Sequence, residues 1–148
     1  MNIIKKINQL AVIIKKKIGS LEQPILTIPI RSLSNVIYDS KDGYFELGGS
    51  NKSRTLSVTT VKTFAQTLKV MGLSKTLVET EDIATKREAY YVSKNWGDAG
   101  FKEQVESDTV MDDVEAMFGV NREQLGFIPE EKGGDIAGAL IVIDKDPG

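Results

Sequence analysis

Residues 2–19 place apolar side chains at a helical period. Hydrophobic positions recur at intervals of four, three and four residues, and five lysines lie outside this stripe. The pattern predicts an amphipathic helix that ends at Gly19. The stripe consists of Ile3, Ile7, Leu10 and Ile14. It can pack on the rest of the domain or dock on a partner, and the pattern allows both.

The next part of the chain is predicted to be extended. Its first segment alternates but contains Pro29, which restricts it to an edge strand or an extended arm. An Asp-Gly pair between two runs of aromatic and branched residues then predicts a β-hairpin. The predicted elements are an arm at 24–31, hairpin strands at 36–38 and 44–47, a flexible turn at 48–53 and a short strand at 54–59.

Helical spacing returns after Thr60. A helix is expected from Val61, with an interruption at Gly72 and a second helical turn beyond it. Thr85, followed three residues later by Glu88, forms a capping-box pattern that opens another helix. Two helices separated by a short break are typical of helix-turn-helix organisation.

The C-terminal part is predicted to hold two helices and a hairpin. The elements are a loop at 97–106, a helix from Ser107 to Gly119, a short helix opened by a second capping box at Asn121 and Gln124, and strands at 127–129 and 139–143. A glycine-tipped hairpin after two helices is the winged-helix arrangement. We therefore expect an α+β fold: a winged-helix (CAP-like helix-turn-helix) domain over 61–148, preceded over 1–60 by a helix, an arm and a β-hairpin.

Composition narrows the possible chemistry. The 148 residues are enough for one domain with a core, and they include neither cysteine nor histidine. Disulfide frameworks, thiolate metal sites and Ser-His-Asp catalysis are thereby excluded. No apolar run approaches the roughly 20 residues of a membrane span, and no signal-peptide pattern opens the chain. We expect a soluble, cytoplasmic protein without a membrane partner.

The net charge of −2 conceals two oppositely charged halves. Residues 1–75 carry 12 Lys and Arg against 4 Asp and Glu, whereas residues 76–148 carry 7 against 17. A basic half is a possible electrostatic footprint for nucleic acid. Two halves that attract each other in the folded state explain the same pattern, and charge alone does not separate these explanations.

The segment 85–98, T-K-R-E-A-Y-Y-V-S-K-N-W-G-D, holds the best candidate chemistry. Arg87 and Tyr91 are four residues apart and share a helix face, whereas Tyr90 points about 100° away. A tyrosine beside a fixed positive charge suits nucleophilic attack on a phosphate, although two aromatics on a helix are more often core residues. The acidic pairs Asp112-Asp113, Glu130-Glu131 and Asp144/Asp146 are expected to be solvated rather than to bind metal.

Long motifs then resemble a known family. They are K-R-E-A-Y-Y-V-S-K-N-W-G-D, E-S-D-T-V-M-D-D-V-E-A-M-F, N-R-E-Q-L-G-F-I-P-E-E-K-G-G-D-I-A-G and, nearer the N-terminus, T-I-P-I-R-S-L-S-N-V-I-Y-D. Together they resemble the A subunits of archaeal type IIB DNA topoisomerases, over nearly the whole chain. The resemblance implies the winged-helix domain that bears the active tyrosine.

By this resemblance Tyr91 is the nucleophile that forms a 5′-phosphotyrosyl link with double-stranded DNA, and Arg87 stabilises the pentavalent phosphate. Tyr90 is assigned to packing. Because a phenol in water ionises only near pH 10, positive charge or a metal must activate it. Lys132 and Gly133 match the family's wing motif and are expected to contact the DNA backbone. With Arg122 as the candidate groove contact, the predicted DNA-binding residues are Lys86, Lys94, Arg122, Lys132 and Gly133.

The resemblance also implies parts that are not expected on this chain. The family's Mg²⁺ is held by a Toprim domain and its ATP by a B subunit, so neither cofactor is expected here. A homodimer is implied, because two strands need two tyrosines. We expect either the tyrosine-bearing domain of such an enzyme, associated with the nucleoid and poorly active alone, or a Toprim-less, non-catalytic DNA-binding relative.

Overall fold

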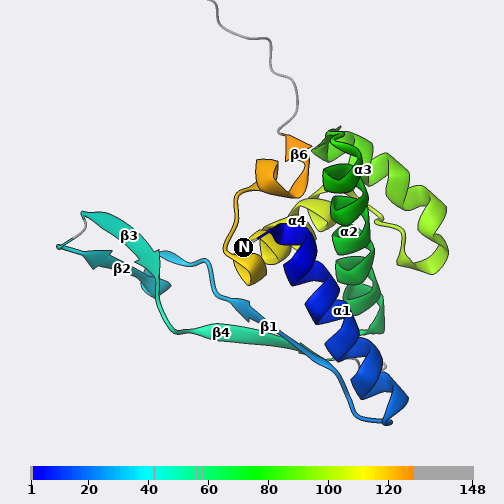
Figure 1. The fold of residues 1–148 in the computed structure, drawn as a ribbon, viewed down its shortest axis with the longest axis horizontal. Coiled ribbons are helices and arrows are strands. Elements are labelled where there is room, and N and C mark those ends of the chain that lie inside the picture. The colour runs from blue at the N-terminus through cyan, green and yellow to red at the C-terminus, as the bar shows by residue number, and fades with distance from the viewer. Residues whose placement is uncertain (1, 42, 56, 58, 129–148) are drawn as a thin grey trace, which may run out of the picture.

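The computed structural model describes residues 2–128 except 42, 56 and 58. In Figure 1 the α-helices form a body, and a long arm of β-strands extends from it. The helices are α1 (Ile3–Gly19), α2 (Val61–Thr80), α3 (Lys86–Val92) and α4 (Gln104–Phe118), with 3-10 turns η1 (Leu33–Asn35), η2 (Ser93–Ala99) and η3 (Arg122–Leu125). The strands are β1 (Ile25–Pro29), β2 (Val36–Asp39), β3 (Tyr44–Leu47), β4 (Asn51–Thr55), β5 (Ala84–Thr85) and β6 (Phe127–Ile128).

Helix α1 confirms the predicted N-terminal helix, and its isoleucine stripe packs inside the domain. Asn2 caps the helix through Ile4 N–H, and Ile3, Ile7 and Ile14 are all less than 10% exposed. The Lys6 ammonium also donates to the Phe118 carbonyl at 2.7 Å and so caps the C-terminal end of α4. The stripe is therefore core, which settles the alternative that the pattern left open.

The arm consists of two antiparallel pairs. Strand β1 pairs with β4, and β2 with β3 forms the predicted hairpin at the far end (Figure 1). The turn predicted at 48–53 is shorter than expected, because β4 already begins at Asn51. The cause is Asn35, whose buried amide donates to the Ile30 and Ser50 carbonyls and accepts from Ser50 N–H. One amide thus fixes both strands where the ribbon meets the hairpin.

Helix α2 runs without a break through Gly72, so the predicted interruption is wrong. Its buried residues, which include Phe64, Val70, Met71 and Leu77, lie on both sides of that glycine. Packing of this continuous apolar face outweighs the low helix propensity of a single glycine. The helix ends instead at Glu81, which adopts the left-handed conformation.

Replacing Gly72 with alanine should therefore raise the free energy of unfolding by about 1 kcal/mol. Gly72 is exposed, and a Cβ there would meet no atom within 4 Å. Urea unfolding followed by circular dichroism measures the change. Gly126→Ala is the opposite control, because Gly126 has φ +81° and its Cβ would lie 2.8 Å from Leu77 Cβ. A destabilised Gly72→Ala would mean that the continuous helix is wrong.

Helix α4 begins at Gln104, so both the loop at 97–106 and the Ser107 cap were predicted wrongly. Ser107 lies inside the helix, fully buried, and its hydroxyl donates to the Gln104 carbonyl at 2.7 Å. A buried serine inside a helix satisfies its hydroxyl by donating to a carbonyl of the preceding turn. In the sequence alone such a serine looks the same as an N-cap. The segment before α4 is the 3-10 turn η2, bent at Gly97, where φ is +60°.

The α+β class is confirmed, and the order α2, β5, α3, α4, η3, β6 is consistent with a winged helix. Strand β5 pairs with β6 in parallel, Ala84 opposite Phe127. The main core joins α1, α2, α3 and α4 around Met71, Met111 and Phe127. The predicted wing, with strand 139–143 and its glycine tip, lies outside the described residues. Within those residues no helix is both long and apolar enough to cross a membrane.

Candidate active site

Helix α3 is short and is fixed at both ends. At its start the predicted capping box is present: Thr85 Oγ accepts from Glu88 N–H at 3.1 Å, and Glu88 accepts from Thr85 N–H at 2.6 Å. At its end buried Ser93 donates to the Tyr90 carbonyl and accepts from Phe101 N–H. The helix of seven residues therefore presents its outer face rigidly.

Tyr91 and Arg87 meet on that outer face. Arg87 Nε donates to the Tyr91 hydroxyl at 3.3 Å, and the guanidinium lies 5.9 Å from the centre of the Tyr91 ring. Tyr91 is 54% exposed, so its oxygen is accessible to a large ligand. The donor is a guanidinium, so a positive charge lies directly beside this oxygen. The pair thus has the geometry of a nucleophile held beside a positive charge.

Tyr90, unlike the exposed Tyr91, is bound to other parts of the domain through both its hydroxyl and its ring. Its hydroxyl donates to the Lys102 carbonyl at 3.1 Å, and the Lys94 ammonium lies 4.1 Å from its ring centre. Its ring is 5.5 Å from that of Tyr91. Tyr90 thus links α3 to the segment after η2, as expected of a packing residue, and it also supports one side of Tyr91.

The two lysines predicted to bind DNA near this site have partners within the domain. Lys86 pairs with Asp108 of α4 at 2.9 Å. Lys94 stacks on Tyr90 and donates to the Phe101 carbonyl at 2.6 Å. Both side chains therefore fix α3 against its neighbours, and a contact with DNA would be additional to this structural role.

Arg122 is bound even more firmly. It forms ion pairs with Glu115 and Asp112, and its side chain is 17% exposed. Burial by itself would lower the pKa of Arg122, but the hydrogen bond to Glu115 and the charges of Glu115, Asp112 and Asp108 raise it above its usual value. Its charge is thus largely matched within the protein. Lys132 and Gly133 lie outside the described residues.

In the folded structure, ion pairs join the two oppositely charged halves of the sequence. Arg31, Lys52, Arg54 and Lys62 of the basic half reach Glu115, Asp113 and Glu106 of α4. For Glu106, burial raises the pKa, but hydrogen bonds from Lys102 N–H and Gln66 and the charges of Lys62 and Lys102 lower it overall. Attraction between the halves is therefore present in the fold.

The acidic pairs differ from expectation in one respect. Asp113 is not solvated but 5% exposed, because Lys52 and Arg54 both bind it. Asp112 is exposed and pairs with Arg122, while residues 130–131, 144 and 146 lie outside the described part. Among residues 2–128 with the three gaps noted above, no cluster of three acidic, histidine or cysteine side chains could hold a metal ion.

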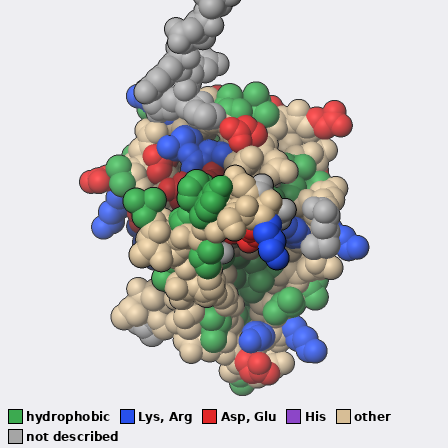
Figure 2. Space-filling view, turned by 90° about the vertical axis from the view of Figure 1, so that its left-hand side faces the viewer, with side chains coloured by type: hydrophobic (Ala, Val, Ile, Leu, Met, Phe, Trp, Pro, Cys, Tyr) green, Lys and Arg blue, Asp and Glu red, His purple; other side chains and the backbone are tan. Residues whose placement is uncertain are grey.

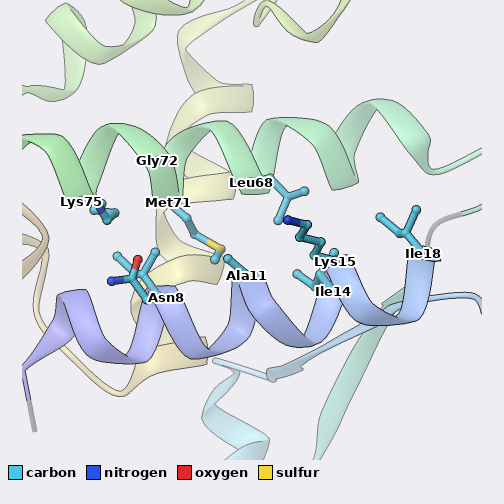
Figure 3. Close-up of a pocket in the computed structure, with 10 residues that line it drawn as sticks. Asn8, Ala11, Ile14, Lys15, Ile18, Leu68, Met71, Gly72 and Lys75 are labelled. Carbon is cyan, nitrogen blue, oxygen red and sulfur yellow. The ribbon is translucent and has the colours of Figure 1, made fainter. Parts of the chain in front are cut away.

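A groove between α1 and α2 was not anticipated. It has a volume of about 420 Å³, and Figure 3 shows Ala11, Ile14 and Ile18 of α1 facing Leu68 and Met71 of α2. The sequence signal was available, since Ala11 and Ile18 flank the buried stripe. Which flank stays open depends on where α2 packs, and periodicity does not give that.

Comparisons with known proteins identify relatives of this chain. A family model described as type IIB DNA topoisomerase matches residues 62–127. The chain is 49% identical over 143 residues to the A subunit of type 2 DNA topoisomerase 6 from Methanocaldococcus jannaschii, covering 97% of this chain and 39% of the relative. The corresponding protein from Methanothermobacter thermautotrophicus is 36% identical over 144 residues, covering 97% and 40%.

A third similar protein, the A subunit from Pyrococcus abyssi, is 34% identical over 149 residues and covers 97% of the chain and 39% of the relative. The chain thus spans about two fifths of the length of these archaeal relatives. The family match includes α2, α3 and α4, and with them Arg87 and Tyr91.

Proposed function

The chain belongs to the type IIB DNA topoisomerase family, and we propose that it is the tyrosine-bearing part of an A subunit that cleaves double-stranded DNA transiently. The observation that supports this most directly is the exposed Tyr91 hydroxyl bound by Arg87 on a rigid, capped helix. Identity to the archaeal topoisomerase relatives over nearly the whole chain favours it over a non-catalytic DNA-binding module.

The proposed step is a transesterification. The Tyr91 oxygen attacks a DNA phosphorus, a phosphotyrosyl bond to the 5′ end forms, and the bond from phosphorus to the 3′ oxygen breaks. The phenol gives up its proton and the leaving 3′ oxygen gains one, so the step is balanced. Arg87 lies within hydrogen-bond distance of the attacking oxygen and can pair with a phosphate oxygen as negative charge develops. Religation reverses the step without an energy source, because the bond energy is conserved.

The residues described here do not fit a Mg²⁺ site. The carboxylates that gather on α4, Asp112, Asp113 and Glu115, are already paired with arginine and lysine side chains. Magnesium and ATP therefore belong, in this proposal, to a Toprim domain and a B subunit. When bound there, Mg²⁺ would polarise the scissile phosphate.

DNA contact is proposed through the face of α3 that carries Arg87 and Tyr91, with Lys86, Lys94, Arg122, Lys132 and Gly133 as further candidates. The internal ion pairs of Arg122 give it a second, structural role. A protein with this activity would be associated with the nucleoid.

Arg122→Ala and Lys132→Ala are predicted to weaken DNA binding and to reduce the slope of log affinity against log salt by about 1 each. Arg122→Ala should in addition lower stability by about 3 kcal/mol, because it leaves Glu115 and Asp112 with one partner fewer. Binding titrations at several salt concentrations and urea unfolding measure the two effects. Unchanged salt slopes in both variants would contradict the contact, whatever happens to stability.

Two partners follow from the proposal. A double-strand break needs two tyrosines, so a second copy of the chain is expected. A B subunit is expected near the N-terminal helix. The isoleucine stripe of α1 is buried, so such a partner would have to use the outer side of the helix, where Val12 and Ile13 are 66% and 53% exposed.

The proposal is tested by incubating the chain with a Toprim domain, a B subunit, Mg²⁺, ATP and supercoiled DNA, then denaturing the mixture. A DNA end that stays attached to the protein through a phosphotyrosyl bond supports it. DNA binding without any covalent adduct would leave the non-catalytic binding module as the function.

A further inference from the structure

The ribbon β1–β4 lies on α4 through one of its two faces. The register places Leu26 opposite Arg54 and Ile28 opposite Lys52, so these four side chains share a face. Leu26 and Ile28 are 1% and 0% exposed. The two cations both reach the carboxylate of Asp113. The apolar side chains of β1 are therefore buried against the body, and the basic side chains of β4 bind it through Asp113.

A second anchor lies beyond the end of β1. Arg31 pairs with Glu115 at 2.8 Å and donates to the Asp112 carbonyl at 3.3 Å. The other oxygen of Glu115 binds Arg122 of η3. Asp113 and Glu115 are only 5% and 7% exposed, and a nearly buried carboxylate is costly once it loses its partner. These two carboxylates hold the arm at two points.

The ribbon contributes little to the main core. Among the residues whose side chains the structure describes, that core draws on the helices, η3, β5, β6 and the segment before α4, and on none of β1 to β4. Leu26 belongs instead to a small cluster with Ile14 and Phe64, which the partly buried Leu10, Leu68 and Met117 connect to the main core. A two-stranded ribbon is at best marginally stable by itself, so its position depends on this cluster and the ion pairs.

We propose that the arm is an electrostatic strap with two states, seated on α4 and released. In the seated state Asp113 and Glu115 are paired with Lys52, Arg54 and Arg31. When these pairs are lost, the ribbon leaves α4 together with the hairpin while the helical body stays folded. The hairpin β2–β3 continues from this ribbon, so the two states hold it at different positions. It carries the exposed side chains Ile37, Tyr38 and Phe45. Figure 2 views the molecule from that side, where hydrophobic, basic and acidic side chains lie next to one another.

Because the chain contains no cysteine, cysteines introduced by substitution are unique sites for spin labels. Lys41→Cys near the hairpin turn and Lys69→Cys on α2 provide two sites for spin labels, and pulsed electron paramagnetic resonance gives the distance distribution between them. In the parent chain, whose ion pairs are intact, we expect one narrow distance, that of the seated state. With Asp113→Asn and Glu115→Gln together, a broad second population should appear while the helical circular dichroism stays unchanged.

Tryptic cleavage after Arg31, Lys52 and Arg54 should also become at least about tenfold faster in the same double variant, because proteolysis follows the population of the open state. The matched control is Glu79→Gln, which removes the 2.7 Å pair with Lys75 elsewhere on α2 and should change neither readout. Arg31→Gln is the milder variant and should give a smaller second population.

Two results would overturn the strap. A single distance identical to that of the parent in the double variant would mean that Leu26 and Ile28 alone hold the ribbon. Loss of helical signal together with the change in distance would mean that the ion pairs belong to the core rather than to a separable arm.

Discussion

Replacing Tyr91 with phenylalanine is expected to abolish the covalent DNA adduct and to leave DNA affinity within about twofold of the parent. The substitution removes only the hydroxyl oxygen that would attack phosphorus. Tyr91 is 54% exposed, and its hydroxyl bonds Arg87 of the same helix. The fold therefore does not depend on the Tyr91 hydroxyl. Denaturing gels of labelled DNA measure the adduct, and equilibrium titrations measure affinity.

Tyr90→Phe is the matched control one residue away. It loses the 3.1 Å bond to the Lys102 carbonyl and should cost about 1 kcal/mol of stability, but it keeps the Tyr91 oxygen and so should keep the adduct. The opposite pattern, an adduct in Tyr91→Phe and none in Tyr90→Phe, would assign the chemistry to Tyr90.

Replacing Arg87 with alanine should slow adduct formation by about 10²–10³-fold, in line with the loss of one donor that stabilises a developing anion. Arg87 donates directly to the attacking oxygen at 3.3 Å, so its removal affects both the nucleophile and the charge on the phosphate. Single-turnover cleavage rates at saturating DNA separate this effect from weaker binding.

Arg87→Lys should restore only part of the rate, because an ammonium lacks the planar fork of donors that a guanidinium offers to an oxygen and a phosphate together. The control Lys69→Ala removes an exposed cation of α2 and should leave the rate unchanged. A normal rate in Arg87→Ala would remove Arg87 from the mechanism and leave Tyr91 to be activated from outside this chain.

Local patterns predicted the parts of the site that local geometry controls. The capping box of Thr85 and Glu88 defines where α3 starts, and helical periodicity then places Arg87 and Tyr91 on one face. The choice of Tyr91 over Tyr90 as nucleophile came from family resemblance. In the structure Tyr91 is the more exposed of the two, and its role as nucleophile stays a prediction.

Predictions were wrong where a single residue was read as a boundary. Gly72 was expected to interrupt a helix and Ser107 to start one, yet both lie inside helices. Glycine and serine mark helix ends only as weak tendencies of roughly 1 kcal/mol. The buried faces of α2 and α4 contribute more than that, and they are defined only by the packed neighbours.

The sequence by itself determined where the helices lie to within a few residues, where the hairpin turns and which residues share a face, because these depend on contacts within a few residues. Only the tertiary structure decided the partners of the charges. Arg122, Lys86 and Lys94 look alike along the chain as candidate DNA contacts. Arg122 binds Glu115, and Lys86 binds Asp108, only because folding brings η3 and α3 against α4. Long-range pairing of this kind leaves no periodic trace in a single sequence.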